Sequence, residues 1–207
     1  QNIDLYESLR RSGIYTILTT SELAAGFMAI GWYRATGQPG VLAAMEGPGF
    51  AWCVAPLAEA AQDAAAIIVI TGKAGENAQP YDQGNIGQDR IATALGATVL
   101  DIIKSGSAGE IVREAWHVVS RHRPKPVVLQ VAMDGESDLA ESREYGFDRQ
   151  DINPVDDRAF ADALSALGLA ERPIILAGAG SVEHSDVLNR LIDEAYIPLL
   201  ATPTARG

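Results

Sequence analysis

Short apolar runs alternate with amphipathic stretches along the chain up to Val131. The apolar runs have the length and composition of buried strands, and they lie at 15–18, 40–45, 66–71, 98–102 and 126–131. The intervening stretches carry apolar residues at helical spacing and predict helices at 3–13, from Glu22 to about Gly37, at about 51–64, at about 89–95 and at 108–121. Strands that alternate with helices indicate a parallel sheet. The sequence therefore predicts an α/β fold, a Rossmann-like three-layer arrangement with helices on both faces of a parallel sheet.

A charged segment without apolar periodicity divides the chain. Residues 1–133 hold the alternating pattern, 134–157 are typical of a linker, and 158–207 hold two further apolar strands, 173–180 and 197–202, joined by a helix at 186–195. Two parallel strands cannot cover both of their own faces, so we expect 158–207 to be the beginning of a second Rossmann-like domain, truncated at its C-terminal end. The first domain is expected to be truncated at its N-terminal end.

Charge and cysteine content exclude several classes of protein. The chain has 27 acidic and 16 basic residues, a net charge of −11, and its Lys and Arg residues form no cluster suited to phosphates, which argues against nucleic acid as a partner. The apolar runs are too short to cross a bilayer and no signal peptide opens the chain, so no membrane partner is expected. The single cysteine, Cys53, fits a reducing compartment and a cytoplasmic location. His117 and His122 are five residues apart, which does not suit a metal pair, and no metal site is predicted.

The helix that opens at Glu22 holds the most informative residues. Thr19, Thr20 and Ser21 are suitable capping residues for this helix, and an acid in the first helical turn is favoured by the helix dipole. Gly37 ends the helix, with Pro39 just beyond. From this pattern alone, a capping role for Glu22 is the simpler interpretation and a catalytic role is the alternative.

Two motifs give Glu22 a further meaning. The helix that it opens ends in Gly31-Trp32-Tyr33-Arg34-Ala35-Thr36-Gly37, and Gly47-Pro48-Gly49 follows the next strand. This order resembles the N-terminal pyrimidine-binding domain of thiamine-diphosphate-dependent enzymes of the acetolactate synthase and 2-oxo acid decarboxylase family. The resemblance runs from Ile3 to Gly207 and is most specific at 22–49 and 171–180. It implies an enzyme, a lyase or transferase, that makes or breaks a carbon–carbon bond next to a carbonyl.

The resemblance also implies a cofactor and roles for particular residues. Glu22 would be catalytic, because in the family this glutamate hydrogen-bonds N1′ of the aminopyrimidine of thiamine diphosphate and promotes the tautomer whose 4′-imino group removes the thiazolium C2 proton. Gly47, Pro48 and Gly49 would face the same cofactor. In the family a Gly-Asp-Gly … Asn segment of a C-terminal domain, which these 207 residues do not contain, holds the diphosphate and Mg²⁺, so the chain by itself is expected to be inactive. The family further implies a small 2-oxo acid as substrate and a homodimer or homotetramer with shared active sites.

Three further residues are expected in the substrate region. Glu46 stands at the exit of an apolar strand, where relatives tend to carry a small or hydroxyl residue; the alternative is a solvated loop acid. Phe50 is bulky where acetolactate synthases have small polar residues. Gln88 lies roughly where that group has a Phe-Gln-Glu element lining the substrate region, although Gln88-Asp89 can equally well just start a helix. Because the carboxyl ends of parallel strands share one sheet edge, these residues are expected to converge with Glu22.

Two other classes of function stay open. Gly178-Ala179-Gly180 follows a strand and precedes a helix, as a nucleotide-binding turn does, but Glu183 stands where the fingerprint has its third glycine. Some members of the family bind FAD or ADP at this turn, so the chain could be a nucleotide-binding module. The other alternative is a non-catalytic homologue that keeps the fold without the chemistry.

Overall fold

The computed structural model describes residues 3–73, 79, 82, 84–103, 108–121, 123–132 and 156–205. The chain forms two compact units, Gln1–Gln150 and Asp151–Gly207, and each is described by itself. Nearly all of the predicted linker at 134–157 lies outside the described residues, so its boundaries stay a prediction.

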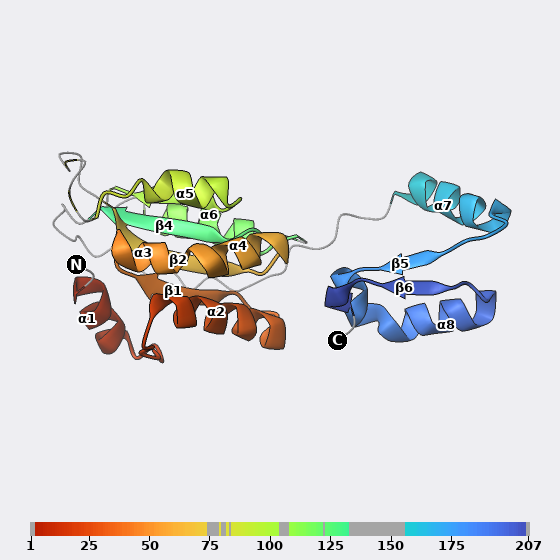
Figure 1. The fold of residues 1–207 in the computed structure, drawn as a ribbon, viewed down its shortest axis with the longest axis horizontal. Coiled ribbons are helices and arrows are strands. Elements are labelled where there is room, and N and C mark those ends of the chain that lie inside the picture. Colours follow the sequence, from red (N-terminus) through yellow and green to blue (C-terminus); the bar gives the residue numbers. More distant parts are fainter. Residues whose placement is uncertain are drawn as a thin grey trace. The chain divides into compact units, whose positions relative to one another are not determined.

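The first unit is a parallel sheet with helices packed against it (Figure 1). Its elements in chain order are α1 (Ile3–Ser12), α2 (Glu22–Thr36), β1 (Gly40–Ala44), α3 (Pro48–Trp52), α4 (Val54–Gln62), β2 (Ile67–Lys73), α5 (Gln88–Ala94), β3 (Thr98–Ile102), α6 (Ala108–Val119) and β4 (Val127–Ala132). The strands lie in the order β1-β2-β4-β3, and every neighbouring pair is parallel. The predicted α/β class with a parallel sheet is therefore confirmed.

Strand order explains which helices share a face. The chain moves in one direction across the sheet from β1 to β2 and on to the far edge at β3, and then turns back to β4. Because such crossovers are right-handed, the helix of the returning connection has to lie on the opposite face. The side chains agree with this rule. Leu57 of α4 and Ala92 of α5 share one apolar cluster with Val69 of β2, whereas Val119 of α6 packs with Ile68 on the other face.

Glycine allows α2 to lie very close to its neighbours. A Cβ atom added at Gly40 of β1 would collide with the backbone of Ala29, and one added at Gly26 would lie 2.6 Å from Cβ of Pro56 on α4. These close contacts fix the position of the helix whose first residue is Glu22. Gly37, with φ of 71°, ends the helix in the left-handed conformation that glycine adopts easily.

Two elements of the first unit differ from the sequence-based prediction. The predicted strand at 15–18 is wrong: these residues join no sheet in the described structure, and Tyr15 and Leu18 are 88% and 97% exposed. A single extended segment needs a neighbouring strand for its backbone hydrogen bonds, and none of the described strands pairs with it. The helix predicted at about 51–64 begins earlier, at Pro48, and is interrupted at Cys53 between α3 and α4.

The second unit contains two strands and the helices around them. Its elements are α7 (Asp157–Leu169), β5 (Ile175–Ala177), the 3₁₀ helix η2 (Ala179–His184), α8 (Ser185–Ala195), β6 (Leu199–Ala201) and the 3₁₀ helix η3 (Pro203–Ala205). The predicted parallel pair is confirmed, with Ile175 opposite Leu199. Helix α7 is not among the helices predicted from the sequence. Its signal is the capping residue Asp156, which accepts hydrogen bonds from the backbone N–H groups of Arg158 and Ala159. Among the described residues, no helix has the length and apolar composition needed to span a membrane.

Candidate functional site

The candidate site lies where β1 and β2 end and where α2 begins. Glu22 is the first residue of α2, and the Ser21 hydroxyl caps the helix by accepting a hydrogen bond of 3.2 Å from the Ala24 N–H. The Thr19 hydroxyl donates to the Ser21 carbonyl at 2.9 Å. Because Ser21 performs the capping, the Glu22 side chain is available for another role at the helix start.

The Glu22 carboxylate lies against the glycine turn that follows β1. A Cβ atom added at Gly49 would come within 2.7 Å of Glu22 Oε1, so only a residue without a side chain leaves the carboxylate in this position. Gly47 has φ of 67°, which favours glycine, and Pro48 is the first residue of α3, where its missing N–H costs nothing. Glu22 and the turn Gly47–Gly49, far apart in the sequence, thus form one wall of the site.

Cys53 lies beneath this wall. Its side chain is fully buried, and its Sγ is 3.8 Å from the Gly49 carbonyl oxygen. Burial raises the pKa of the Cys53 thiol from its ordinary value of 9.0 to about 12, and the negative charge of Glu22 adds to the rise. In the folded chain the thiol therefore stays protonated at pH values where the unfolded chain ionises it. The free energy of unfolding is therefore expected to be unaffected by this thiol below pH 9.0. It should fall as the pH rises from 9.0 toward about 12, because there the unfolded chain ionises the thiol and the folded chain does not.

We expect Cys53 to be almost inert toward iodoacetamide in the native chain. At pH 8 its reactive thiolate is about a thousandfold scarcer than in the unfolded chain, because thiolate fraction follows pKa. Labelling in buffer and in urea, followed by mass spectrometry, measures the difference. Glu22→Gln should speed the native reaction by removing a nearby negative charge, whereas Glu59→Gln, on the exposed side of α4, should not. Equal labelling rates in buffer and urea would contradict the burial of this thiol.

Glu46, the residue before this turn, lies against glycines other than the one that Glu22 contacts. A Cβ atom added at Gly72, near the end of β2, would be 2.6 Å from Glu46 Oε2, and one at Gly84 would be 3.0 Å from its Cγ. The side chain therefore runs along two glycines and is half-buried. A fully solvated loop acid, the alternative in the sequence analysis, does not describe this arrangement.

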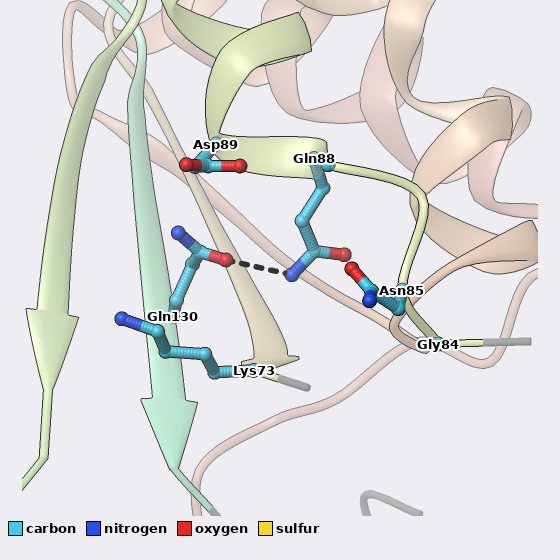
Figure 2. Close-up of a pocket in the computed structure, with 7 residues that line it drawn as sticks. Lys73, Gly84, Asn85, Gln88, Asp89 and Gln130 are labelled. Atoms are coloured by element: carbon cyan, nitrogen blue, oxygen red, sulfur yellow. Dashed lines mark hydrogen bonds between the residues drawn. The ribbon is translucent and has the colours of Figure 1, made fainter. Parts of the chain in front are cut away.

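Gln88, the first residue of α5, is buried within a polar network at the same edge of the sheet. Its Oε1 accepts from the Gly47 N–H at 3.3 Å, and its Nε2 donates to the Gly72 carbonyl at 2.6 Å and to Gln130 Oε1 at 2.9 Å. Figure 2 shows Gln88 and Gln130 facing each other. Both residues line a hollow of about 130 Å³. The residues that line it are Lys73, Gly84, Asn85, Gly87, Gln88, Asp89 and Gln130, so the hollow adjoins Gln88 rather than Glu22.

The structure brings together most of the predicted site residues. Glu22, Glu46, the Gly47–Gly49 turn and Gln88 all lie at the carboxyl edge of the sheet, as expected. Phe50 differs, because its side chain is fully buried in the apolar core and does not line the hollow. A substrate role for Glu46, Phe50 or Gln88 stays a prediction.

Sequence reasoning missed Lys73, Asp101 and Gln130. Each is a polar residue at the carboxyl end of a predicted apolar strand, which is the signal that could have found them. No group of three or more potential metal ligands occurs among the described residues. His122 lies outside the described part of the chain. At the second unit's turn, a Cβ atom added at Gly178 or Gly180 would meet no described atom within 4 Å, so the structure does not require glycine there.

A parallel sheet whose carboxyl edge gathers an acid, a glycine turn and a buried amide network is a domain of the α/β ligand-binding class. Residues 1–94, less than half of the chain, match the family model described as "Thiamine pyrophosphate enzyme, N-terminal TPP binding domain". The resemblance identified from the Glu22 and Gly47-Pro48-Gly49 motifs is thereby confirmed.

Curated relatives agree with the family match. The chain is 26% identical to the "Probable 2-ketoarginine decarboxylase AruI" of Pseudomonas aeruginosa over 99% of this chain and 38% of that protein. It is 26% identical to the mitochondrial acetolactate synthase catalytic subunit of Saccharomyces cerevisiae, over 99% of this chain and 32% of the yeast protein. It is 29% identical to the acetolactate synthase of Mycobacterium bovis, over 92% of this chain and 32% of that protein. The chain thus spans about a third of the length of these relatives.

Proposed function

We propose that this chain forms the pyrimidine-binding part of a thiamine-diphosphate enzyme that makes or breaks a carbon–carbon bond next to the carbonyl of a 2-oxo acid. The observation that carries the proposal is the Glu22 carboxylate at the start of α2, held against Gly49. The family match and the printed activities of the relatives, acetolactate synthesis and 2-ketoarginine decarboxylation, support it.

The residues present fit the aminopyrimidine of the cofactor. A ring nitrogen needs a carboxyl oxygen within hydrogen-bond distance, and a flat ring needs a wall without side chains; Glu22 and Gly49 offer these two features side by side. When bound, the cofactor supplies the electron sink for the reaction. In our proposal the Glu22 carboxyl group holds or releases a proton at the pyrimidine nitrogen, and the Gly47–Gly49 backbone fixes the ring against it.

Three further features belong to the proposal. Mg²⁺ and the diphosphate would be held by residues outside this chain, in the manner of the family. The full-length protein would be a homodimer or homotetramer, supported by the exposed apolar residues Phe27, Met28 and Trp32 on α2, because such a surface is typical of an interface. A cytoplasmic location is supported only by the single, unpaired cysteine Cys53. FAD or ADP at Gly178–Gly180 stays a prediction without a supporting contact.

The function is tested on the full-length protein with a panel of 2-oxo acids that includes pyruvate and 2-ketoarginine. We expect at least one of them to be consumed, with release of carbon dioxide, only when both thiamine diphosphate and Mg²⁺ are present. Light scattering on the same preparation should give an assembly larger than a monomer. Cofactor-independent turnover would contradict the proposed chemistry, and a strict monomer at micromolar concentration would contradict the shared site.

A further inference from the structure

A continuous chain of hydrogen bonds crosses the carboxyl end of the sheet. The Gly47 N–H donates to Gln88, the Gln88 amide donates to Gln130, and the Gln130 Nε2 donates to Asp101 Oδ1 at 3.1 Å. The other oxygen of Asp101, Oδ2, pairs with the Lys73 ammonium. Figure 2 shows Gln88 reaching from the start of α5 toward Gln130 on β4, with Lys73 beyond it. The chain connects β3, an edge strand of the described sheet, to the turn beside Glu22.

All donors in this chain point toward Asp101, and its charge accounts for that direction. An ionised carboxylate only accepts hydrogen bonds, so the Gln130 amide must turn its NH₂ group toward Asp101. Gln130 Oε1 then faces Gln88 and requires a donor, which fixes the Gln88 NH₂ group on that side. Gln88 Oε1 is left facing the Gly47 N–H.

The opposite orientation of Gln88 would leave buried groups unpaired. Its second amide hydrogen is used by the Gly72 carbonyl, so a flipped amide would place Oε1 against two acceptors and Nε2 against the Gly47 donor. Gln88 and Gln130 are 4% and 3% exposed, so water cannot easily replace these contacts. Both amide hydrogens of Gln88 are thus used within the protein.

We propose that Gln130 and Asp101 are positioning residues, which hold the Gly47–Gly49 turn against the Glu22 carboxylate by fixing the orientation of Gln88. Gln88 itself then acts through the turn rather than by donating to substrate. The catalytic meaning of this arrangement rests on the proposed function. Its geometry does not, and the two can be tested separately.

The geometric part is tested by amide hydrogen exchange at Gly47, measured by NMR on the full chain. Gln88→Met and Gln130→Met keep the length of the side chain and remove its hydrogen bonds, and each is expected to speed exchange at Gly47 by about fivefold, the equivalent of one net hydrogen bond. Because Gln130 acts through Gln88, the double variant should exchange no faster than Gln88→Met alone. Exchange at Val69, in the middle of β2, should not change.

Thr71→Val is the matched control. Thr71 lies beside Gln130 in the register of β2 and β4 and is 1% exposed, and its hydroxyl has no hydrogen-bond partner among the described residues. This variant should leave Gly47 exchange unchanged. The proposal is overturned if Gln130→Met leaves the rate of amide exchange at Gly47 unchanged, or if the effects of the two Met substitutions on that rate are additive. It is also overturned if amide exchange rises equally throughout the sheet.

The catalytic part is tested in the full-length protein. Gln130→Met is expected to slow exchange of the C2 proton of bound thiamine diphosphate by about tenfold, because a displaced turn misplaces the groups beside Glu22. Thr71→Val should not slow it. An unchanged rate in Gln130→Met overturns the positioning role. Failure of the wild-type protein to use thiamine diphosphate would instead overturn the proposed function, while the Gly47 result would still decide the geometry.

Discussion

Glu22→Gln is expected to slow exchange of the C2 proton of bound thiamine diphosphate by on the order of a hundredfold or more, the usual range for a lost acid–base group. Gln has nearly the same size as Glu and can occupy the same place against Gly49, but it cannot hold and release a proton at the pyrimidine nitrogen. The fold should survive, because Ser21 rather than Glu22 caps α2. The measurement is C2–H to deuterium exchange in the full-length protein, read by NMR after acid quench.

Glu59→Gln provides the matched control for this substitution. It makes the same chemical change on the exposed side of α4, where Glu59 pairs with Arg34 at 3.0 Å, and a surface ion pair contributes little to stability. The exchange rate in this variant should equal that of the wild type. If Glu22→Gln still binds the cofactor and exchanges at the wild-type rate, Glu22 is only an acid at a helix start. The non-catalytic homologue then becomes the better interpretation.

Gly26→Ala is expected to destabilise the first unit by about 3 kcal/mol or more, the upper range for overpacking in a core. The new methyl group would lie 2.6 Å from Cβ of Pro56, and a proline ring in the first turn of α4 has little freedom to move away. Urea unfolding followed by tryptophan fluorescence measures the change. Trp32, Trp52 and Trp116 all belong to the first unit, so the signal reports on that unit.

Gly31→Ala makes the same substitution on the exposed side of the same helix. A Cβ atom there would meet no described atom within 4 Å, and alanine is a better helix former than glycine, so we expect stabilisation by about 0.5–1 kcal/mol. If the free energy of unfolding falls in Gly26→Ala and rises in Gly31→Ala, packing against Pro56, rather than helix propensity, determines the effect of the substitution at position 26. Equal stabilisation in both variants would show that α2 does not pack as described.

The sequence predicted those elements whose pattern is local. The apolar run at 66–71 gave β2, and the helix from Glu22 to Gly37 gave α2, because a capping residue, an apolar face and a C-terminal glycine lie within the segment itself. The segment 15–18 has an equally apolar pattern but joins no described strand. Pairing depends on a distant partner, which local pattern does not report.

For the candidate site, the sequence predicted which residues lie at the carboxyl edge of the sheet, but not how their side chains are oriented. Residues that share a sheet edge with Glu22 could be inferred from strand order, and the resemblance pointed to the glycine turn. Which way a side chain points could not be inferred, since Phe50 is one residue beyond Gly49 and yet lies in the core. The hydrogen bond from Gln88 to Gln130 joins residues 42 positions apart, and the one from Gln130 to Asp101 joins residues 29 positions apart. Only the folded sheet brings these residues together.

The polar chain across the sheet also ties the site to strand register. Thr71, Gln130 and Asp101 stand opposite one another on β2, β4 and β3. If β3 paired with β4 in a register shifted by one residue, Leu100 or Ile102 would stand opposite Gln130. The Asp101 side chain would then point toward the sheet face covered by α6. The turn beside Glu22 can therefore reach its final geometry only after this edge strand has docked correctly. Assembly of the sheet and maturation of the site are in this sense a single event.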